Sequence, residues 1–265
     1  MIVPARDVFV EVGGVFIRWL KKTFRRPAFV FFSLVQPIVW FLLFTQAFQS
    51  IANIPGFKEI TGTDSYLTFF SAAVIIQTII ASAMQSGMGM VTDIESGYMD
   101  KMRVAPIHRF TILLGKLMSD GVRILLQTII ILVLAVALGV TFATGIGGVA
   151  LLLVIAVAFG IAWSGISTFI ALTTRNSEAT LMISLLTTFP LLFLSTAVMP
   201  RTLLPSWVQD VATYNPITYV ADVLHDLIIT GFDWATFAYA ALVTAVVGAV
   251  TLSATTAMFR RAVSI

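Results

Sequence analysis

The chain has 265 residues, of which 58% are hydrophobic and only 11% are charged, and its mean hydropathy is +0.99. A soluble domain carries about 25% charged residues, so this composition excludes an ordinary soluble protein and predicts one whose main solvent is lipid. The absence of cysteine excludes disulfides and thiolate metal sites, and the formal charge of +3 is not arranged in the basic, aromatic stripe that nucleic-acid binding requires.

The first 26 residues are predicted to form an amphipathic helix in the membrane interface. Apolar side chains recur every four residues, and charged side chains occupy the opposing side. The apolar set is Val8, Val12, Phe16, Leu20 and Phe24, and the charged set is Glu11, Arg18, Lys22 and Arg25. A solvated basic leader is the alternative, and no cleavable signal peptide is expected.

Six membrane-spanning helices are expected, because a span needs about 20 apolar residues and a charge at the bilayer centre costs several kcal/mol. Stretches without charged residues place them at roughly 28–49, 67–90, 124–142, 149–173, 179–199 and 234–257. Fourteen of the 16 basic residues then fall on the side of the termini, which predicts that both termini are cytoplasmic. No ionisable side chain lies deep inside a predicted span, which argues against a proton- or ion-coupled carrier.

The connection 91–123 is the longest one predicted on the cytoplasmic side. Its apolar residues Tyr98, Met99, Met102 and Val104 have helical spacing and precede a break at Pro106. The apolar side of such a short surface helix needs a cover, which could be lipid headgroups or a protein partner.

A second pattern in the same connection is Lys116, Asp120 and Arg123, which share one helix face at the start of the third predicted span. Two interpretations stay open: a structural, salt-bridged face, or a role in gating or proton movement.

The external connection 200–233 contains two apolar half-helices separated by Asn215-Pro216, each too short to cross a bilayer. They predict a re-entrant hairpin before the last span, and two interfacial helices forming a surface cap are the alternative.

Polar and small side chains inside the spans indicate helix contacts. Gln36, Gln77, Gln85 and Gln127 favour bonds across helices over contacts with a substrate. The strip Ala241, Ala245 and Ala249 is suited to close packing against a neighbouring helix. No phosphate-binding loop or catalytic motif is present, so the chain is not expected to be an enzyme.

The order of these segments resembles the ABC-2 type permeases, the membrane subunits of type V ABC exporters. The cytoplasmic stretch from Glu95 to Pro106 is similar to their coupling element. The external stretches Leu204-Pro-Ser-Trp-Val-Gln209 and Asn215-Pro-Ile-Thr-Tyr219 are similar to the segments before their last span. Residues 174–178 resemble their short fourth connection, which often carries a proline where Ser177 stands here. The drug- and antibiotic-exporting branch is the more similar one.

The resemblance implies two groups of site residues, one on the cytoplasmic side and one on the external side. ATPase coupling would involve Glu95, Ser96, Gly97, Tyr98, Met99, Asp100, Lys101, Met102, Arg103, Ala105 and Pro106. An external hairpin or gate would involve Leu204, Pro205, Trp207, Asn215, Pro216 and Tyr219.

The expected protein is therefore an all-α integral membrane protein with a single domain, 1–265, that serves as the permease subunit of an ATP-driven exporter in the plasma membrane. The resemblance implies two ATPase subunits that use Mg-ATP, a second identical or related permease copy, and no cofactor or metal bound by this chain. A hydrophobic or amphipathic substrate, such as a drug, an antibiotic or a lipid-like molecule, suits the apolar spans. The alternatives are a self-contained carrier or channel, an exporter of a polysaccharide or glycolipid, and a scaffold that recruits a soluble partner.

Overall fold

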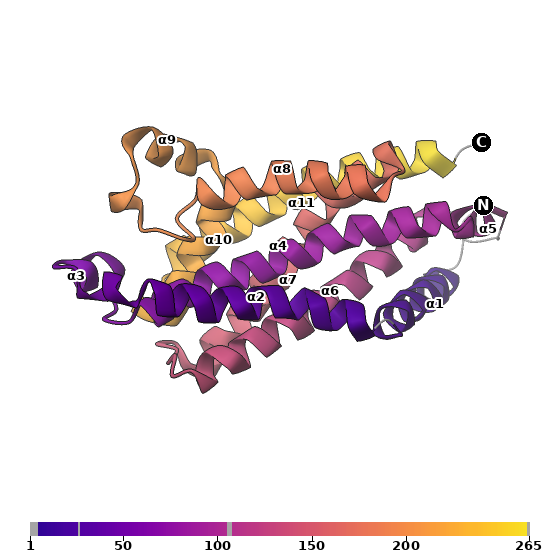
Figure 1. The fold of residues 1–265 in the computed structure, drawn as a ribbon. Helices are drawn as coiled ribbons and strands as arrows, with labels where there is room; N and C mark the ends of the chain where they lie inside the picture. Colours follow the sequence, from indigo (N-terminus) through magenta and orange to yellow (C-terminus); the bar gives the residue numbers. More distant parts are fainter. Residues whose placement is uncertain (1–4, 26, 105–107, 264–265) are drawn as a thin grey trace.

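The computed structural model describes residues 5–25, 27–104 and 108–263, and in these ranges the regular structure is entirely helical. The long helices run side by side in one bundle (Figure 1). They are α2 (Pro27–Ala47), α4 (Tyr66–Glu95), α6 (Arg109–Ala137), α7 (Gly145–Thr174), α8 (Ser177–Phe193) and α11 (Trp234–Val263). The predicted all-α class is confirmed.

Four of the long helices, α4, α6, α7 and α11, are long and apolar enough to cross a membrane. The shorter apolar stretches Ser33–Ala47 in α2 and Ser177–Phe193 in α8 lie in the same bundle. Four of the six predicted spans are thus confirmed by length and composition, and the other two stay predictions.

The two ends of the bundle carry different elements (Figure 1). The first end holds α1 (Ala5–Phe24), α5 (Tyr98–Val104) and the C-terminal end of α11, and we call it the terminal end. The opposite end holds shorter elements: η1 (Gln49–Asn53), α3 (Phe57–Thr61), η2 (Arg201–Leu203), α9 (Ser206–Tyr214), α10 (Pro216–His225) and the π-helical η3 (Asp226–Thr230).

Side-chain caps begin several of these helices. The Ser65 hydroxyl accepts a hydrogen bond from the Thr68 amide at 3.3 Å at the start of α4. The Asn176 side chain accepts from the Ala179 amide at 2.9 Å at the start of α8. Asp233 accepts from the amides of Ala235 and Thr236 before α11, and its hydrogen bonds with Thr236 hold the pKa of the Asp233 carboxyl below its usual value.

The core of the bundle depends on a close approach between α4 and α7. A methyl group added at Gly87 would lie 2.3 Å from the backbone oxygen of Ser167, so only glycine fits at this crossing. The Ser167 hydroxyl also accepts a hydrogen bond from the Gly87 amide at 3.2 Å. The backbones of the two helices therefore pack in direct contact near the terminal end.

Helix α6 begins at Arg109, well before the start of the predicted span 124–142. As a result Lys116, Asp120 and Arg123 lie inside a helix that qualifies as a span, and Lys116 and Asp120 are buried. The sequence placed these charges on a helix face at the cytoplasmic start of the third span, and the structure shows that neighbouring helices enclose them.

Candidate functional site

The segment from Glu95 to Lys101 runs from the last residue of α4 into the first half of the short helix α5, at the terminal end of the bundle. Gly97 has a φ of 67°, in the left-handed region that favours glycine, and this turn folds α5 back toward α4. The exposed side chains of the segment are Glu95, Ser96, Asp100 and Lys101. These four polar residues form the part of the predicted coupling element that a partner could contact.

The apolar side of α5 is covered by the chain itself. Met99 and Met102 are buried, at 5% and 6% exposure, in a cluster formed by the ends of α4, α6, α7 and α11. Their principal neighbours are Met90, Val91, Ile112, Ala171, Leu172 and Phe259. For Met99 and Met102 the expectation of a cover by lipid or a partner is wrong, because the Gly97 turn places α5 against this cluster, and the side chain of Val104 lies outside the described residues.

The terminal segment α1 is a helix packed on the bundle, which excludes the solvated leader. Its buried side consists of Val12, Val15 and Trp19. An added methyl group at Gly115 of α6 would lie 2.9 Å from the Val15 Cβ, so the α1 and α6 backbones are close together there.

Charged contacts tie α1 to the end of α4 and to α5. The buried Asp93 carboxylate accepts hydrogen bonds from the Arg18 Nη2 at 2.7 Å and from the Lys22 Nζ at 2.6 Å. The Arg18 guanidinium lies 3.4 Å above the centre of the Tyr98 ring. Arg18 thus contacts both α4 and α5, the two helices that the Glu95–Lys101 segment joins.

Two connections that are distant in the sequence meet at Glu95. The Ser177 hydroxyl, at the start of α8, donates to the Glu95 carboxylate at 3.3 Å. The predicted short fourth connection therefore lies beside the predicted coupling element. Of the remaining coupling residues, Ala105 and Pro106 lie outside the described residues, as does the side chain of Arg103.

The charged side chains of α6 form ion pairs with one another. The Asp120 carboxylate forms salt bridges with the Lys116 Nζ at 2.8 Å and with the Arg123 Nη2 at 2.9 Å. Ser86 of α4 donates to the same carboxylate at 2.6 Å, and Arg123 also donates to the Ser82 backbone oxygen at 2.8 Å. The cluster therefore joins α6 to α4 and forms the salt bridges that the structural interpretation predicted, in a buried position and not on a surface face.

A groove of about 280 Å³ lies between α2, α4 and α8. On α4, where most side chains are buried, it follows a stripe of partly exposed residues: Gln77, Ala81, Gln85 and Met88. Gln36 of α2 also lines it, and α8 contributes Leu181, Leu185, Thr188, Phe189 and Leu192. The Gln85 Oε1 atom is buried and has no hydrogen-bond partner among the described residues.

Three of the four predicted intramembrane glutamines therefore line a groove instead of bonding across helices. The fourth fits the prediction, since the Gln127 Nε2 donates to the Ser33 hydroxyl at 2.7 Å.

At the opposite end, Asn215 fixes the junction between α9 and α10. Its Nδ2 donates to the backbone oxygens of Leu191 and Leu194 at 2.6 and 2.9 Å, and its Oδ1 accepts from the Ile217 amide at 3.0 Å. The first helical position of α10 is Pro216, which needs no hydrogen-bond partner for its nitrogen. The side chain of Asn215 thus links the end of α8 to the start of α10.

The two half-helices of the predicted hairpin differ in burial. Most of α10, from Ile217 to Leu224, is buried against α4 and α11, whereas α9 buries only Val208 and Ala212. Trp207 is 61% exposed and Pro205 is also exposed. The Leu204 backbone oxygen accepts from Gln209 at 2.9 Å, and the Tyr219 hydroxyl donates to the Thr213 backbone oxygen at 2.8 Å.

Comparison with known proteins agrees with this architecture. Residues 11–229 match the ABC-2 type transporter family, which is more than half of the chain. The chain belongs to the ABC-2 type transporter family. The resemblance to this family that the sequence predicted is therefore confirmed.

Named ABC-2 relatives are transport permeases. The chain is 30% identical over 224 residues to ycf38 of Cyanophora paradoxa, assigned as a transport permease, with 82% of this chain and 72% of that protein covered. It is 26% identical over 226 residues to the daunorubicin resistance ABC transporter permease protein DrrB1 of Streptomyces coeruleorubidus, covering 84% and 77%. It is 22% identical over 213 residues to DrrC of Mycobacterium tuberculosis, assigned to doxorubicin resistance, covering 80% and 73%.

Sequence reasoning missed several residues of this ABC-2 chain that the structure brings to the site. Asp93 and Trp19 were not singled out, although Asp93 is the shared carboxylate between α1 and α4, and the contact of Ser177 with Glu95 was not predicted. An available signal was the acidic residue directly after the uncharged stretch 65–92, which a basic amino-terminal helix could pair with.

Proposed function

We propose that this chain is the membrane permease subunit of an ATP-driven exporter that moves a hydrophobic or amphipathic substrate out of the cytoplasm or inner leaflet. Two separate ATPase subunits would supply the energy from Mg-ATP, and a second permease copy, identical or related, would complete the path. The membrane would be the plasma membrane, with the terminal end of the bundle on the cytoplasmic side. Membership of the ABC-2 family and the concentration of basic residues at the terminal end support this proposal.

The observation that carries the proposal is the attachment of α5 to four long helices. Met99 and Met102 are buried among the ends of α4, α6, α7 and α11, while Asp100 and Lys101 of the same helix are exposed. An ATPase that contacts the exposed side of α5 would therefore move a packed unit and not a loose loop. Closure of the ATPase pair would bias the bundle between inward-open and outward-open arrangements.

The groove between α2, α4 and α8 supports the substrate class. It combines apolar residues with the amides of Gln36, Gln77 and Gln85, which suits a mostly apolar molecule with a few hydrogen-bonding groups. Sites for drug-sized ligands have volumes of about 300–1,000 Å³, so one groove of about 280 Å³ is at the lower limit. A facing groove from a second permease copy would enlarge the path.

The names of the relatives support a drug or antibiotic as the exported molecule. DrrB1 and DrrC are named for daunorubicin and doxorubicin resistance. Both compounds combine a planar apolar part with polar groups, as the groove residues require. Daunorubicin is therefore a suitable probe for the transport measurement.

A self-contained proton-coupled carrier is the second candidate, because Lys116, Asp120 and Arg123 lie within a candidate span. In that mechanism one of these groups would have to exchange a proton with water. The mutual pairing of all three side chains and the hydrogen bond from Ser86 favour a structural role. Transport without ATP would support the carrier and contradict the exporter.

The test is ATP-dependent uptake of daunorubicin by inside-out proteoliposomes that contain the chain and the ATPase that co-purifies with it. We expect the double variant Asp100→Ala, Lys101→Ala to lose ATPase binding and transport while keeping its thermal stability. We expect Glu95→Ala to lower transport at constant ATPase activity. The matched control is Glu59→Ala, an exposed acidic residue at the opposite end of the bundle. Normal transport by the double variant would contradict the coupling assignment.

A further inference from the structure

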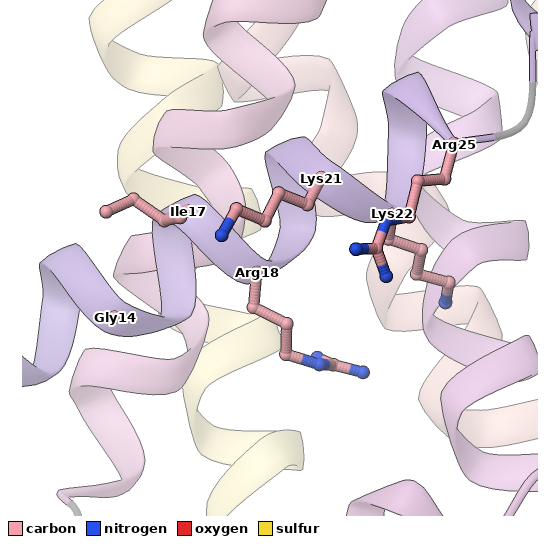
Figure 2. A pocket seen from close by; sticks show the side chains of 6 residues that line it. All are labelled: Gly14, Ile17, Arg18, Lys21, Lys22 and Arg25. Carbon is pink, nitrogen blue, oxygen red and sulfur yellow. The ribbon is translucent and has the colours of Figure 1, made fainter.

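A basic hollow of about 670 Å³ lies along α1 at the terminal end of the bundle. Six residues of α1 line it: Gly14, Ile17, Arg18, Lys21, Lys22 and Arg25. Figure 2 shows the terminal groups of Arg18, Lys22 and Arg25 on the same side of the α1 ribbon, and the side chain of Lys21 directed toward Ile17. One helix thus presents four cations along one open surface.

The charges of this hollow are not balanced within the described chain. Asp93 is the acidic partner, and it pairs with Arg18 and Lys22. The side chains of Lys21 and Arg25 are exposed and make no hydrogen bond or ion pair with any described residue. The Arg18 Nη1 atom is buried and also has no hydrogen-bond partner there. The side chains of Lys21 and Arg25 are therefore available to an anionic group, and the Arg18 guanidinium beside them adds positive charge that Asp93 shares with Lys22.

The apolar neighbours of these cations identify the kind of anion. Ile17 lines the hollow and is 49% exposed, and Phe24 on the same helix is 53% exposed. Further toward the start of α1, Phe9 and Val10 are 78% and 70% exposed. An acidic soluble protein would satisfy the cations but would not require the apolar stripe, whereas a phospholipid offers a phosphate and acyl chains at adjacent depths.

We infer that the hollow on α1 is a binding site for the phosphodiester headgroup of an anionic phospholipid. Lys21 and Arg25 would bind the phosphate oxygens beside the Arg18 guanidinium, and the acyl chains would lie against Ile17 and Phe24. Because the Arg18 guanidinium is stacked on Tyr98 and paired with Asp93, the bound headgroup would stabilise the contact between α1 and the Glu95–Lys101 segment.

The test is native mass spectrometry of the purified full chain with equal amounts of phosphatidylglycerol and phosphatidylcholine. We expect the wild-type chain to retain phosphatidylglycerol preferentially, and the double variant Lys21→Gln, Arg25→Gln to weaken that binding about fivefold per residue. The matched control, Lys58→Gln, Arg201→Gln, removes two cations from the opposite end of the bundle and should keep the preference. Circular dichroism and gel filtration establish that each variant is folded.

Two further arms separate a lipid from other anionic ligands. Ile17→Gln, Phe24→Gln should weaken retention of phosphatidylglycerol, and soluble glycerol phosphate should compete poorly with the lipid. Equal binding of glycerol phosphate and phosphatidylglycerol would overturn the lipid assignment. An unchanged lipid preference in Lys21→Gln, Arg25→Gln would also overturn it. If this variant keeps the lipid preference but no longer co-purifies with the ATPase, the hollow binds a protein partner instead. These outcomes do not depend on whether the chain is an exporter.

Discussion

Asp93 and Arg18 form a 2.7 Å salt bridge between α4 and α1, although 75 positions separate them in the sequence. Asp93 is only 2% exposed and also binds Lys22, so it is the main polar link between the two helices. We expect Asp93→Asn to lower the free energy of unfolding by about 1.5–3 kcal/mol, because hydrogen bonds to a charged group are lost. Hydrogen exchange of the α1 amides should increase, as measured by mass spectrometry.

The matched control for this prediction is Asp64→Asn. Asp64 pairs with Lys58 at 2.6 Å, but both side chains are largely exposed, at 74% and 64%. Exposed pairs contribute little to stability, so no measurable change is expected. Equal effects of the two substitutions would show that Asp93 does not hold α1 in place.

The crossing of α4 and α7 should not tolerate a methyl group at Gly87. In Gly87→Ala the new Cβ would lie 2.3 Å from the Ser167 backbone oxygen, which forces the helices apart. We expect a loss of about 1–3 kcal/mol in stability, as for other overpacked sites, measured by thermal unfolding in detergent. In the control Gly147→Ala the added methyl group has no neighbour within 4 Å, so stability should be unchanged or slightly higher.

Filling the groove should stop transport without unfolding the protein. Ala81→Trp places a large ring among α2, α4 and α8, in the groove of about 280 Å³. We expect at least a tenfold decrease in daunorubicin transport with ATPase binding retained. Val154→Trp, on an exposed part of α7, is the control and should transport normally. Normal transport by Ala81→Trp would show that the substrate follows another path.

Stability at the opposite end of the bundle should depend on pH through His225. Its ring is stacked on Phe69 with 4.6 Å between centroids, and burial lowers the pKa of His225 from 6.5 to about 4. The unfolded chain binds the proton first, so the stabilisation is complete above about pH 6.5 and is lost as the pH falls toward 4.

The expected loss is about 3 kcal/mol, at 1.36 kcal/mol per pKa unit. Thermal unfolding at a series of pH values measures it, and His225→Phe should flatten the profile between these limits. A wild-type profile that matches that of His225→Phe would contradict the prediction.

The sequence was sufficient for the helical class, because apolar length alone identifies α4, α7 and α11. It also located the break at Asn215-Pro216, since asparagine caps a helix and proline begins one. It was incomplete for α6, which begins at Arg109 and ends at Ala137, whereas the predicted span was 124–142. The i, i+4 spacing predicts the pairing of Lys116 with Asp120, but it does not contain the burial of this pair against Ser86 of α4.

The last helix shows a second limit of pattern reasoning. The strip of Ala241, Ala245 and Ala249 was expected to pack against a neighbour, yet Ala245 and Ala249 are exposed in the chain. Instead, α11 contacts α7 through the face of Thr251 and Thr255, whose hydroxyls donate to backbone oxygens of α7 at 2.7 Å. Residue size alone did not distinguish the two faces, because threonine packs closely when a backbone oxygen accepts its proton.

The groove and the cover of α5 were unpredictable for a related reason. Both depend on which helices become neighbours, and the cluster around Met99 and Met102 joins residues from Met90 to Phe259. Spacing within one segment identified an apolar side and the glutamine positions. The spacing did not identify which helices would face the apolar side of α5 or the glutamines.

The position of α1 also has a consequence for the order of assembly during synthesis. The surfaces that bury Val15 and pair Arg18 are Gly115 of α6 and Asp93 of α4, and both follow α1 in the chain, so they leave the ribosome later. The contacts of α1 with α6 therefore form only after α6 has been synthesised. Docking of α1 is consequently a late step in biogenesis, and its burial is complete only when both α4 and α6 are in place.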